Sequence, residues 1–310
     1  MYIKLYPSQS FMLLGQRNNQ EDYRWPEADH SPASQRFFIV CDGVGGLEKG
    51  EVASRLVASD MAQELEHFDW KTPLTNEQFG AILDEAYNTL DDVATAENDG
   101  MATTFTLAAF HAGGVSMAHI GDSRIYHIRP GEGILYRTDD HSLVNSLVHK
   151  GMLSPEQATT DPRRNIITRY MAPTDKDQTR CMANLLTSRD VQAGDYFFLC
   201  TDGVIQCVDD DMLLDVLEQD CDNNEKITTL KQACTKADDN STAILIQVEM
   251  VESNQDQDAP PVSINADNTH STTLNASQEE CVVVIASNNR HHTRNKKPSL
   301  MSRLFKLLQI

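Results

Sequence analysis

The sequence predicts an α+β fold, in which strands and helices occupy separate stretches of the chain. Three observations predict it: apolar strand-like runs at residues 37–41 and 196–200, two amphipathic helical patterns after the first run, and four short strand-like segments between residues 103 and 137. The elements do not alternate as strand, helix and parallel strand, which argues against a doubly wound sheet.

Apolar periodicity indicates the first strand and the first two helices. Residues 37–41 form a short apolar run that stops at Asp42-Gly43, which is typical of a strand. Two helical faces follow, and the second opens with a capping box, Thr75-x-x-Gln78. Their apolar positions are Ala53, Val57, Met61 and Leu65 in the first helix and Phe79, Ile82, Leu83, Ala86, Leu90 and Val93 in the second.

After Asn98-Asp99-Gly100 the apolar period changes from that of helices to that of strands. Short glycine-containing turns separate four segments, which predicts an antiparallel meander. The segments are residues 103–110, 115–120, 124–129 and 134–137.

The second half of the chain is more mixed. Residues 142–150 read as a helix, Ser154-Pro155 starts another, and the rest of the stretch up to Arg189 has few strong apolar signals. A buried strand at residues 196–200 again ends in an aspartate and a glycine. Helices at 212–217 and 227–237 and a closing strand at 242–248 complete the expected elements.

The composition divides the chain into a folded domain and two further segments. We expect one domain over residues 1–250, a polar flexible linker over 251–289, and a basic amphipathic tail over 290–310. The tail has two interpretations: a frayed or self-docking end, or an anchor for a partner or a membrane surface.

Charge and cysteine content limit the classes of function. The net charge of −20 repels phosphate backbones and argues against nucleic acid as a partner. The acids either confer solubility or hold a cation, and composition does not separate the two. The seven cysteines are an odd number without a C-x-x-C pair, which indicates free, mostly buried thiols in a reducing compartment, so we expect a cytoplasmic protein. No apolar run is long enough for a transmembrane helix.

The stretch after the first strand, Asp42-Gly43-Val44-Gly45-Gly46, has three interpretations: a turn, a phosphate-binding loop, or one arm of a metal site. Lys49 is followed by glycine rather than by a hydroxyl residue, so the stretch is not a Walker A loop. Glu48 occupies the last glycine position of a dinucleotide fingerprint, which excludes that motif as well.

Other acids also stand at or near strand ends. They are Glu21-Asp22, Asp122, Asp202 before Gly203, and Asp238-Asp239. Acids at strand ends can converge at one edge of a sheet, and oxygen ligands without histidine or cysteine suit magnesium or manganese. The segment from Asp220 resembles the start of a calcium EF-hand, but Glu225 and Lys231 stand where that loop needs glycine and glutamate.

Five motifs occur in the order and approximate spacing of one known family. They are Arg17-x-x-x-Glu21-Asp22, Asp42-Gly43-x-Gly45-Gly46, Gly121-Asp122-Ser123-Arg124, Thr201-Asp202-Gly203 and Asp239-Asn240. In this the chain resembles the metal-dependent serine/threonine protein phosphatases of type 2C, the PPM family, and most closely its bacterial branch. The resemblance covers about residues 10–249. It implies a central sandwich of two antiparallel β-sheets with helices on both outer faces.

The resemblance also implies a site for two magnesium or manganese ions. Asp42 is expected to bridge the two ions, and the Gly43 carbonyl to bind one of them. Asp202 and Asp239 are expected to complete the shell of the first ion.

Four further roles are carried over from the family in the same way. Glu21 and Asp22 are expected to support the second ion, partly through water. Arg17 is expected to grip the substrate phosphate through two parallel hydrogen bonds. Asp122 matches a residue that helps to hold a third, weaker ion in bacterial relatives.

The implied reaction is removal of phosphate from phosphoserine and phosphothreonine in proteins. Two divalent ions can neutralise the phosphomonoester and activate water for in-line attack without a phospho-enzyme. Two alternatives are a catalytically silent binding or regulatory module and a phosphatase of small metabolites. We expect a monomer that acts on phosphoprotein substrates of a serine/threonine kinase.

The source of the proton for the leaving group departs from the family pattern. Animal members carry a histidine where this chain has Val44. A metal-bound water is the favoured donor, and His141 is either an alternative donor or a lone surface histidine. Residues 145–190 fall where relatives carry a flap beside the active site, which is expected to control substrate access.

Overall fold

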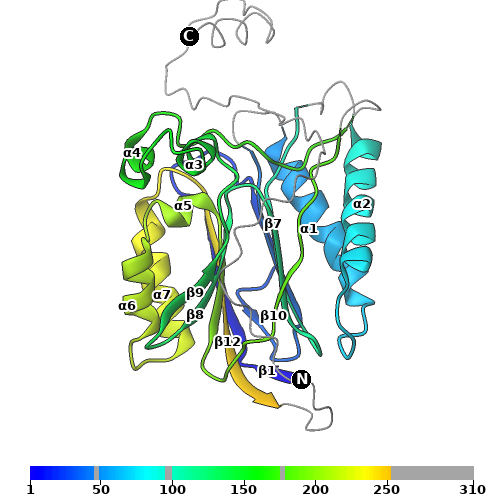
Figure 1. Cartoon of the computed structure of the whole chain (residues 1–310), viewed down its shortest axis with the longest axis vertical. Coiled ribbons are helices and arrows are strands. Elements are labelled where there is room, and N and C mark those ends of the chain that lie inside the picture. The colour runs from blue at the N-terminus through cyan, green and yellow to red at the C-terminus, as the bar shows by residue number, and fades with distance from the viewer. Residues whose placement is uncertain (45–48, 95–99, 175–178, 253–310) are drawn as a thin grey trace, which may run out of the picture.

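Two antiparallel β-sheets pack face to face in the centre of the molecule, and a pair of helices covers each outer face (Figure 1). The computed structural model describes residues 1–44, 49–94, 100–174 and 179–252. Helices α1 (Gly50–Glu66) and α2 (Asn76–Val93) cover one sheet, and α6 (Asp210–Leu217) and α7 (Asn223–Ala233) cover the other. The predicted α+β fold and its four layers are therefore confirmed.

The two sheets differ in size. The larger sheet has the order β4 (His30–Ser31), β2 (Ser8–Leu13), β12 (Ser241–Glu252), β11 (Tyr196–Cys200), β8 (Arg124–Arg129) and β9 (Gly133–Arg137), and β1 (Tyr2–Leu5) pairs with β12. The smaller sheet has the order β10 (Leu186–Ser188), β7 (Gly114–Ile120), β6 (Phe105–His111), β5 (Phe37–Asp42) and β3 (Asp22–Trp25).

The central strands are apolar on both faces because each is covered on both sides. In β5, Phe37, Ile39 and Cys41 face α1 and α2, whereas Phe38 and Val40 face the other sheet. This alternation between two buried faces explains why the strand reads as a continuous apolar run.

The prediction of one meander over residues 103–137 is wrong. Strand β7 pairs with β6 and β10, whereas β8 pairs with β9 and β11 in the other sheet. The chain therefore forms two hairpins and crosses between the sheets at residues 121–123. The short Gly-Asp-Ser link resembles a hairpin turn, and only the packing of two covered sheets distinguishes a crossing from a turn.

The helical predictions agree well with the structure. The capping box that opens α2 is present, because Gln78 N donates to Thr75 Oγ1 at 3.2 Å and Thr75 N donates to Gln78 Oε1 at 3.0 Å. Helix α4 (Pro155–Thr160) starts at the predicted Ser154 cap. The remaining helices are α3 (Leu143–His149), α5 (Asp202–Ile205) and a 3-10 turn, Cys234–Lys236.

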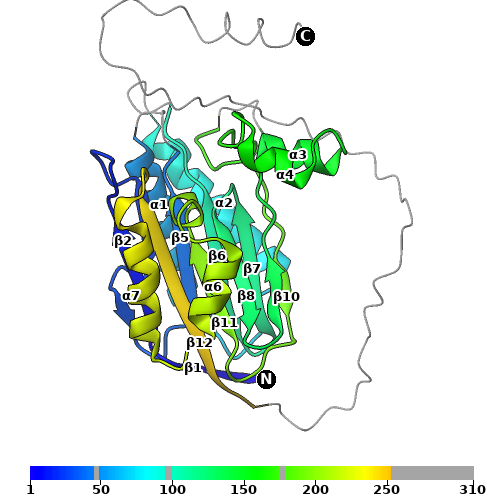
Figure 2. The same cartoon turned by 90° about the vertical axis from the view of Figure 1, so that its left-hand side faces the viewer.

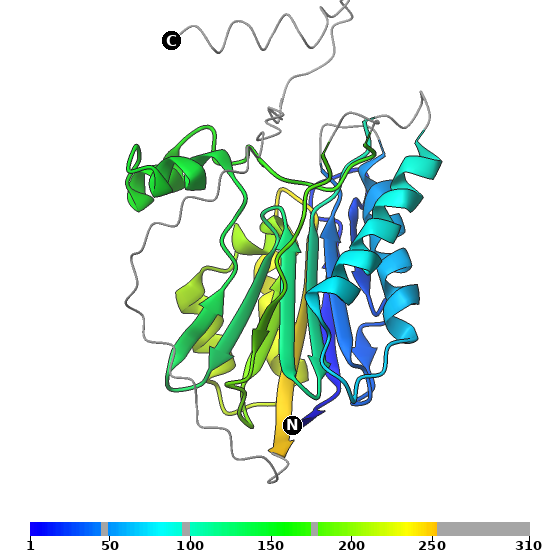
Figure 3. The same ribbon diagram turned by 45° about the vertical axis from the view of Figure 1, so that its right-hand side comes forward.

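Helices α3 and α4 lie beyond one end of the sandwich, away from the N-terminus (Figures 2 and 3). At the opposite end, β12 extends to Glu252 and so includes the first two residues of the predicted linker. The rest of the linker and the basic tail lie outside the described residues. Within the described parts of the chain, no helix is long and apolar enough to cross a membrane.

Candidate functional site

The predicted acids come from different elements that meet at the end of the sandwich next to α3 and α4 (Figure 2). Asp42 ends β5, Asp22 begins β3, and Asp202 opens α5 directly after β11. Asp239 precedes β12, and Asp122 lies on the crossing from β7 to β8.

Asp22 and Asp42 are directly opposite each other on the neighbouring antiparallel strands β3 and β5. Two like charges at such a position destabilise a sheet unless a positive charge lies between them. Burial, followed by the charges of Asp22 and Asp202, raises the pKa of Asp42 well above its usual range. Asp122 and Asp239 contribute to the same shift, so the other four carboxyls all lie within electrostatic reach of Asp42.

The carboxyl group of Asp22 is buried and only partly satisfied. Its Oδ2 accepts a hydrogen bond of 3.0 Å from the Thr201 hydroxyl, whereas its Oδ1 has no hydrogen-bond partner among the described residues. Burial is the main reason why its pKa is raised to about 7, and Asp202 and Asp239 add to the shift. An unpartnered buried carboxylate oxygen is a suitable ligand for a hard cation.

Asp202 reaches Asp239 because Gly203 has no side chain. A Cβ atom on Gly203 would lie 2.0 Å from the Asn240 carbonyl oxygen, so only glycine lets α5 pack against the start of β12. Burial first, and then the charge of Asp239, raises the pKa of Asp202 to about 6. Gln206 Nε2 donates to Asp202 Oδ2 at 3.2 Å.

Gly43 is required by backbone packing. A Cβ on Gly43 would come within 2.5 Å of the Gly50 backbone at the start of α1 and within 2.6 Å of the Glu21 carbonyl oxygen. That carbonyl accepts hydrogen bonds from Gly43 N at 3.0 Å and from Ser54 Oγ at 2.6 Å. The glycine thereby brings Glu21, Asp42 and the first turn of α1 together.

Arg17 and Asp239 form an ion pair, in which Arg17 Nη2 donates to Asp239 Oδ2 at 2.6 Å. Arg17 is thus placed at the carboxylate cluster with a side chain that is 42% exposed. Within the described ranges, no group of three or more histidine, cysteine, aspartate or glutamate side chains is already arranged to hold a metal ion. An ion that binds Asp239 has to compete with Arg17 for this carboxylate.

Asn240 holds the loop that carries Arg17 and Glu21, a role that sequence reasoning missed. Its Oδ1 accepts from Glu21 N at 2.8 Å, and its Nδ2 donates to the carbonyls of Leu14 at 2.8 Å and Asn19 at 3.1 Å. A buried amide of this kind needs several hydrogen-bond partners, but the sequence beside Asp239 does not identify them.

A cavity of about 750 Å³ extends from the carboxylate cluster to the flap region. Asp122 and Asp202 line one end of it, and α3, α4 and the start of α6 form its walls. The structure thus places the first part of segment 145–190 beside the site. Residues 175–178 of the segment lie outside the described residues.

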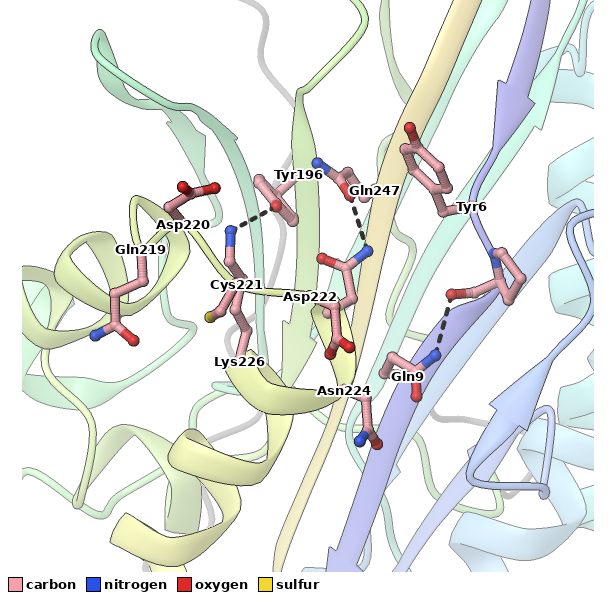
Figure 4. Close-up of a pocket in the computed structure, with 12 residues that line it drawn as sticks. Tyr6, Gln9, Tyr196, Gln219, Asp220, Cys221, Asp222, Asn224, Lys226 and Gln247 are labelled. Atoms are coloured by element: carbon pink, nitrogen blue, oxygen red, sulfur yellow. Dashed lines mark hydrogen bonds between the residues drawn. The ribbon is translucent and has the colours of Figure 1, made fainter.

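A second cavity, of about 520 Å³, lies between the β1–β2 link and the start of α7 (Figure 4). No predicted site residue lines it. Its polar groups bond to one another: Lys226 Nζ donates to the Tyr196 hydroxyl at 3.0 Å, and Asn223 Nδ2 donates to Gln247 Oε1 at 2.8 Å. This cavity is separate from the candidate site.

The interpretation of His141 as a lone surface histidine is wrong. Its ring is half-buried and stacks on the ring of His119, with 4.4 Å between the centroids. Burial, followed by the facing His119, lowers the pKa of His141 to about 3. Val44 is buried and has no proton to give.

None of the six cysteines in the described residues forms a disulfide bond, as predicted. Cys41, Cys200 and Cys234 are buried, and the other three described cysteines are partly buried. Cys281 lies outside the described residues.

Comparison with known proteins places the chain in a family. Residues 16–237 match the family model described as Protein phosphatase 2C. PstP, a serine/threonine protein phosphatase of Mycobacterium tuberculosis, is 34% identical over 192 residues, which are 60% of this chain and 35% of PstP. The protein phosphatase PhpP of Streptococcus pneumoniae is 31% identical over 249 residues, which are 75% of this chain and 93% of PhpP.

Solved structures share the architecture. The serine/threonine phosphatase Stp1 of Staphylococcus aureus has a TM-score of 0.67 at 29% identity, covering 80% of this chain and 96% of Stp1. The catalytic domain of PstP in complex with two manganese ions has a TM-score of 0.63 at 27% identity, covering 80% and 100% of the two chains. The fold is that of bacterial serine/threonine phosphatases. The chain belongs to the protein phosphatase 2C family.

Proposed function

We propose that the chain removes phosphate from phosphoserine and phosphothreonine side chains in proteins with two bound magnesium or manganese ions. The observation that carries the proposal is the like-charged pair Asp22 and Asp42 at opposing strand positions, with Asp22 Oδ1 unpartnered in the described part of the chain. Opposed like charges destabilise a sheet, and a divalent cation bound between the two carboxylates would remove that repulsion.

The ligand roles proposed here are those that the family resemblance implies. We assign Asp42 to both ions, and its carboxyl lies near those of Asp22 and Asp202. Asp202, Asp239 and the Gly43 carbonyl are assigned to the first ion. Asp22 and Glu21 are assigned to the second ion, and Asp122 to a third and weaker one.

The bound ions supply positive charge for the phosphate dianion and activate water as the nucleophile. Arg17 binds the substrate phosphate: its guanidinium is partly exposed at the cluster and can leave Asp239 once a cation takes over that carboxylate. The negative carboxylates repel free phosphate esters, so the site binds substrate only when cations are present. Val44 has no side-chain proton to donate, and we assign protonation of the leaving alkoxide to water.

Protein substrates are favoured over small metabolites because the matched relatives PstP and PhpP are named protein phosphatases. A silent binding module is less favoured, because Arg17 and every expected acid are present. We further propose that the protein is a cytoplasmic monomer opposing a serine/threonine kinase. The tail 290–310 is proposed to dock a partner or a membrane surface. Unchanged localisation and unchanged partner recovery after deletion of residues 251–310 would contradict this docking role.

The test is hydrolysis of a chromogenic phosphomonoester and of a phosphopeptide panel, with and without manganese. Wild type is expected to turn over only with a divalent ion, and Asp42→Asn and Asp202→Asn are expected to lose roughly 100-fold or more in kcat/KM. Absence of turnover with any divalent ion would instead support the binding module. Faster turnover of small phosphoesters than of every phosphopeptide would support the metabolite phosphatase.

A further inference from the structure

Two consecutive residues, Asp140 and His141, bond to the turn that carries Asp122, one at each end of the turn. On one side, Gly121 N donates to His141 Nδ1 at 3.0 Å, and His141 N donates to Gly121 O at 2.9 Å. On the other side, Arg124 donates from Nε and Nη2 to the two carboxylate oxygens of Asp140, each at 2.7 Å. The four-residue segment 121–124 is thereby fixed at both of its ends.

The His141 ring is itself held in one orientation. It stacks on His119 with 4.4 Å between centroids and 9° between the ring planes, and His119 Nε2 donates to the Asp139 carbonyl at 2.9 Å. Since Nδ1 of His141 accepts from an amide N–H, the neutral ring carries its proton on Nε2. The low pKa of His141, which burial causes first, keeps the ring neutral near pH 7.

The segment that contains Asp140 and His141 is hydrogen-bonded to the flap region. The His141 carbonyl accepts from Thr168 N at 2.7 Å, and Leu143 N at the start of α3 donates to Ile166 O at 2.8 Å. Asn145 Nδ2 of α3 donates to the Asp140 carbonyl at 2.9 Å. A shift of the flap therefore acts on Asp140 and His141, and through them on the turn 121–124.

We propose that His141 and Asp140 are positioning residues for Asp122, which hold its carboxylate where it can bind the third divalent ion and link its position to the flap. This inference rests on the proposed function, because Asp122 acts as a ligand only in a site that binds ions. It gives His141 a role different from proton donor. Groups that orient ligands in this way typically change metal affinity by about 10–100-fold when they are removed.

The test measures Mn²⁺ binding directly, by electron paramagnetic resonance of free Mn²⁺ in titrations of the full chain. Asp122→Asn is expected to lose the weakest binding event. His141→Gln, whose amide cannot reach the Nδ1 position, is expected to weaken that event about 10-fold or more while the tighter events change less than about 2-fold. His141→Asn places Oδ1 at the position of Nδ1 and is expected to retain the event within about 3-fold.

The outcomes separate this inference from the proposed function. Wild type that binds no Mn²⁺ and shows no turnover overturns both. Wild type with Mn²⁺-dependent turnover, but equal Mn²⁺ binding in wild type, Asp122→Asn and His141→Gln, overturns this inference alone. Equal losses in His141→Gln and His141→Asn indicate a merely structural role and also overturn it.

A measurement on the wild-type protein covers the case in which the variants fail to fold. ¹⁵N NMR of the histidine rings is expected to show His141 with its proton on Nε2 and a scalar coupling between Nδ1 and the Gly121 amide nitrogen. A proton on Nδ1 of His141 would overturn the proposal.

Discussion

Arg17 serves two interactions that exclude each other. Its guanidinium is bonded to Asp239 at 2.6 Å, yet the proposed reaction needs the same guanidinium on the substrate phosphate and the same carboxylate on a cation. A side chain that is 42% exposed can move between the two partners. In the proposed reaction, Arg17 therefore links ion binding to substrate binding.

Replacement of Arg17 is expected to lower the affinity for a phosphopeptide and to raise the affinity for Mn²⁺. Arg17→Ala removes charge-assisted hydrogen bonds to phosphate, each worth about 1.5–3 kcal/mol, so KM for a phosphopeptide is expected to rise roughly 10–100-fold. It also frees Asp239, so the affinity for Mn²⁺ is expected to rise a few-fold. Calorimetric titration and steady-state kinetics measure both, with Arg17→Lys as the variant that keeps the charge. A parallel loss of both affinities would contradict this exchange.

The acids of the site could be predicted from the sequence because each stands at a strand end with a recognisable neighbour. Asp42 and Asp202 follow apolar runs, and both precede glycine. Asn240 and His141 could not be assigned roles in this way. Asn240 bonds to a residue 219 positions away and His141 to one 20 positions away, and no local pattern encodes such partners.

The joint between α5 and β12 depends on close backbone contact. Gly203→Ala puts a Cβ 2.0 Å from the Asn240 carbonyl oxygen, which forces the two elements apart. We expect a loss of about 2–4 kcal/mol in the free energy of unfolding, together with weaker Mn²⁺ binding because Asp202 moves away from Asp239. Urea denaturation and Mn²⁺ titration measure the two effects.

Gly80 is the matched control, since it lies inside α2 and a Cβ there meets no atom within 4 Å. Gly80→Ala is expected to stabilise the protein by about 0.5–1 kcal/mol through helix propensity. Equal effects of the two substitutions would refute the packing argument for Gly203.

The hairpin of β6 and β7 contains a buried histidine, His111, and we expect it to make the protein less stable at acidic pH. His111 is 4% exposed, its Nε2 is bonded to the Ser116 hydroxyl at 2.7 Å, and its Nδ1 accepts from Gly113 N at 3.0 Å. Burial lowers its pKa to about 4 from 6.5. Between pH 6.5 and 4 the histidine is therefore protonated in the unfolded chain but not in the native state. The free energy of unfolding falls as pH decreases from about 6.5 towards 4.

The contribution of His111 is on the order of 1–3 kcal/mol across that window. His111→Asn keeps an acceptor for Gly113 N but does not titrate there. The difference between the unfolding free energies of wild type and this variant is expected to change with pH between 6.5 and 4. A difference that stays constant over this range would show that His111 does not titrate as proposed.

The strands at the centre of the molecule could be predicted from apolar runs, whereas those at the N-terminus could not. Strands β1, β2 and β3 mix polar and apolar residues because they lie at or near the edges of the sheets. The crossing from β7 to β8 was also missed, because a turn and a sheet change need the same residues. Assignment of strands to two sheets is a property of the whole fold, set by which apolar faces meet.

Divalent ions are expected to stabilise the entire fold, because the cluster joins β3, β5, α5 and β12 from both sheets. Without cations, burial first and then the charges of neighbouring acids raise the pKa of Asp22, Asp42 and Asp202, so the charged forms of these carboxyls are destabilised. Mn²⁺ at 100 times its dissociation constant adds about 2.7 kcal/mol, which raises Tm by roughly 5–10 °C for a domain of this size.

Asp42→Asn removes one of the repelling charges, so we expect Tm without metal at pH 7.5 to rise by a few degrees while the Mn²⁺-dependent rise disappears. Asp215→Asn, on the exposed face of α6, removes the same charge far from the cluster and is the control. That variant is expected to match wild type with and without Mn²⁺, because a single surface charge contributes little. Calorimetry measures Tm for the three proteins, and a lower metal-free Tm for Asp42→Asn than for wild type would contradict the proposed repulsion between the carboxylates.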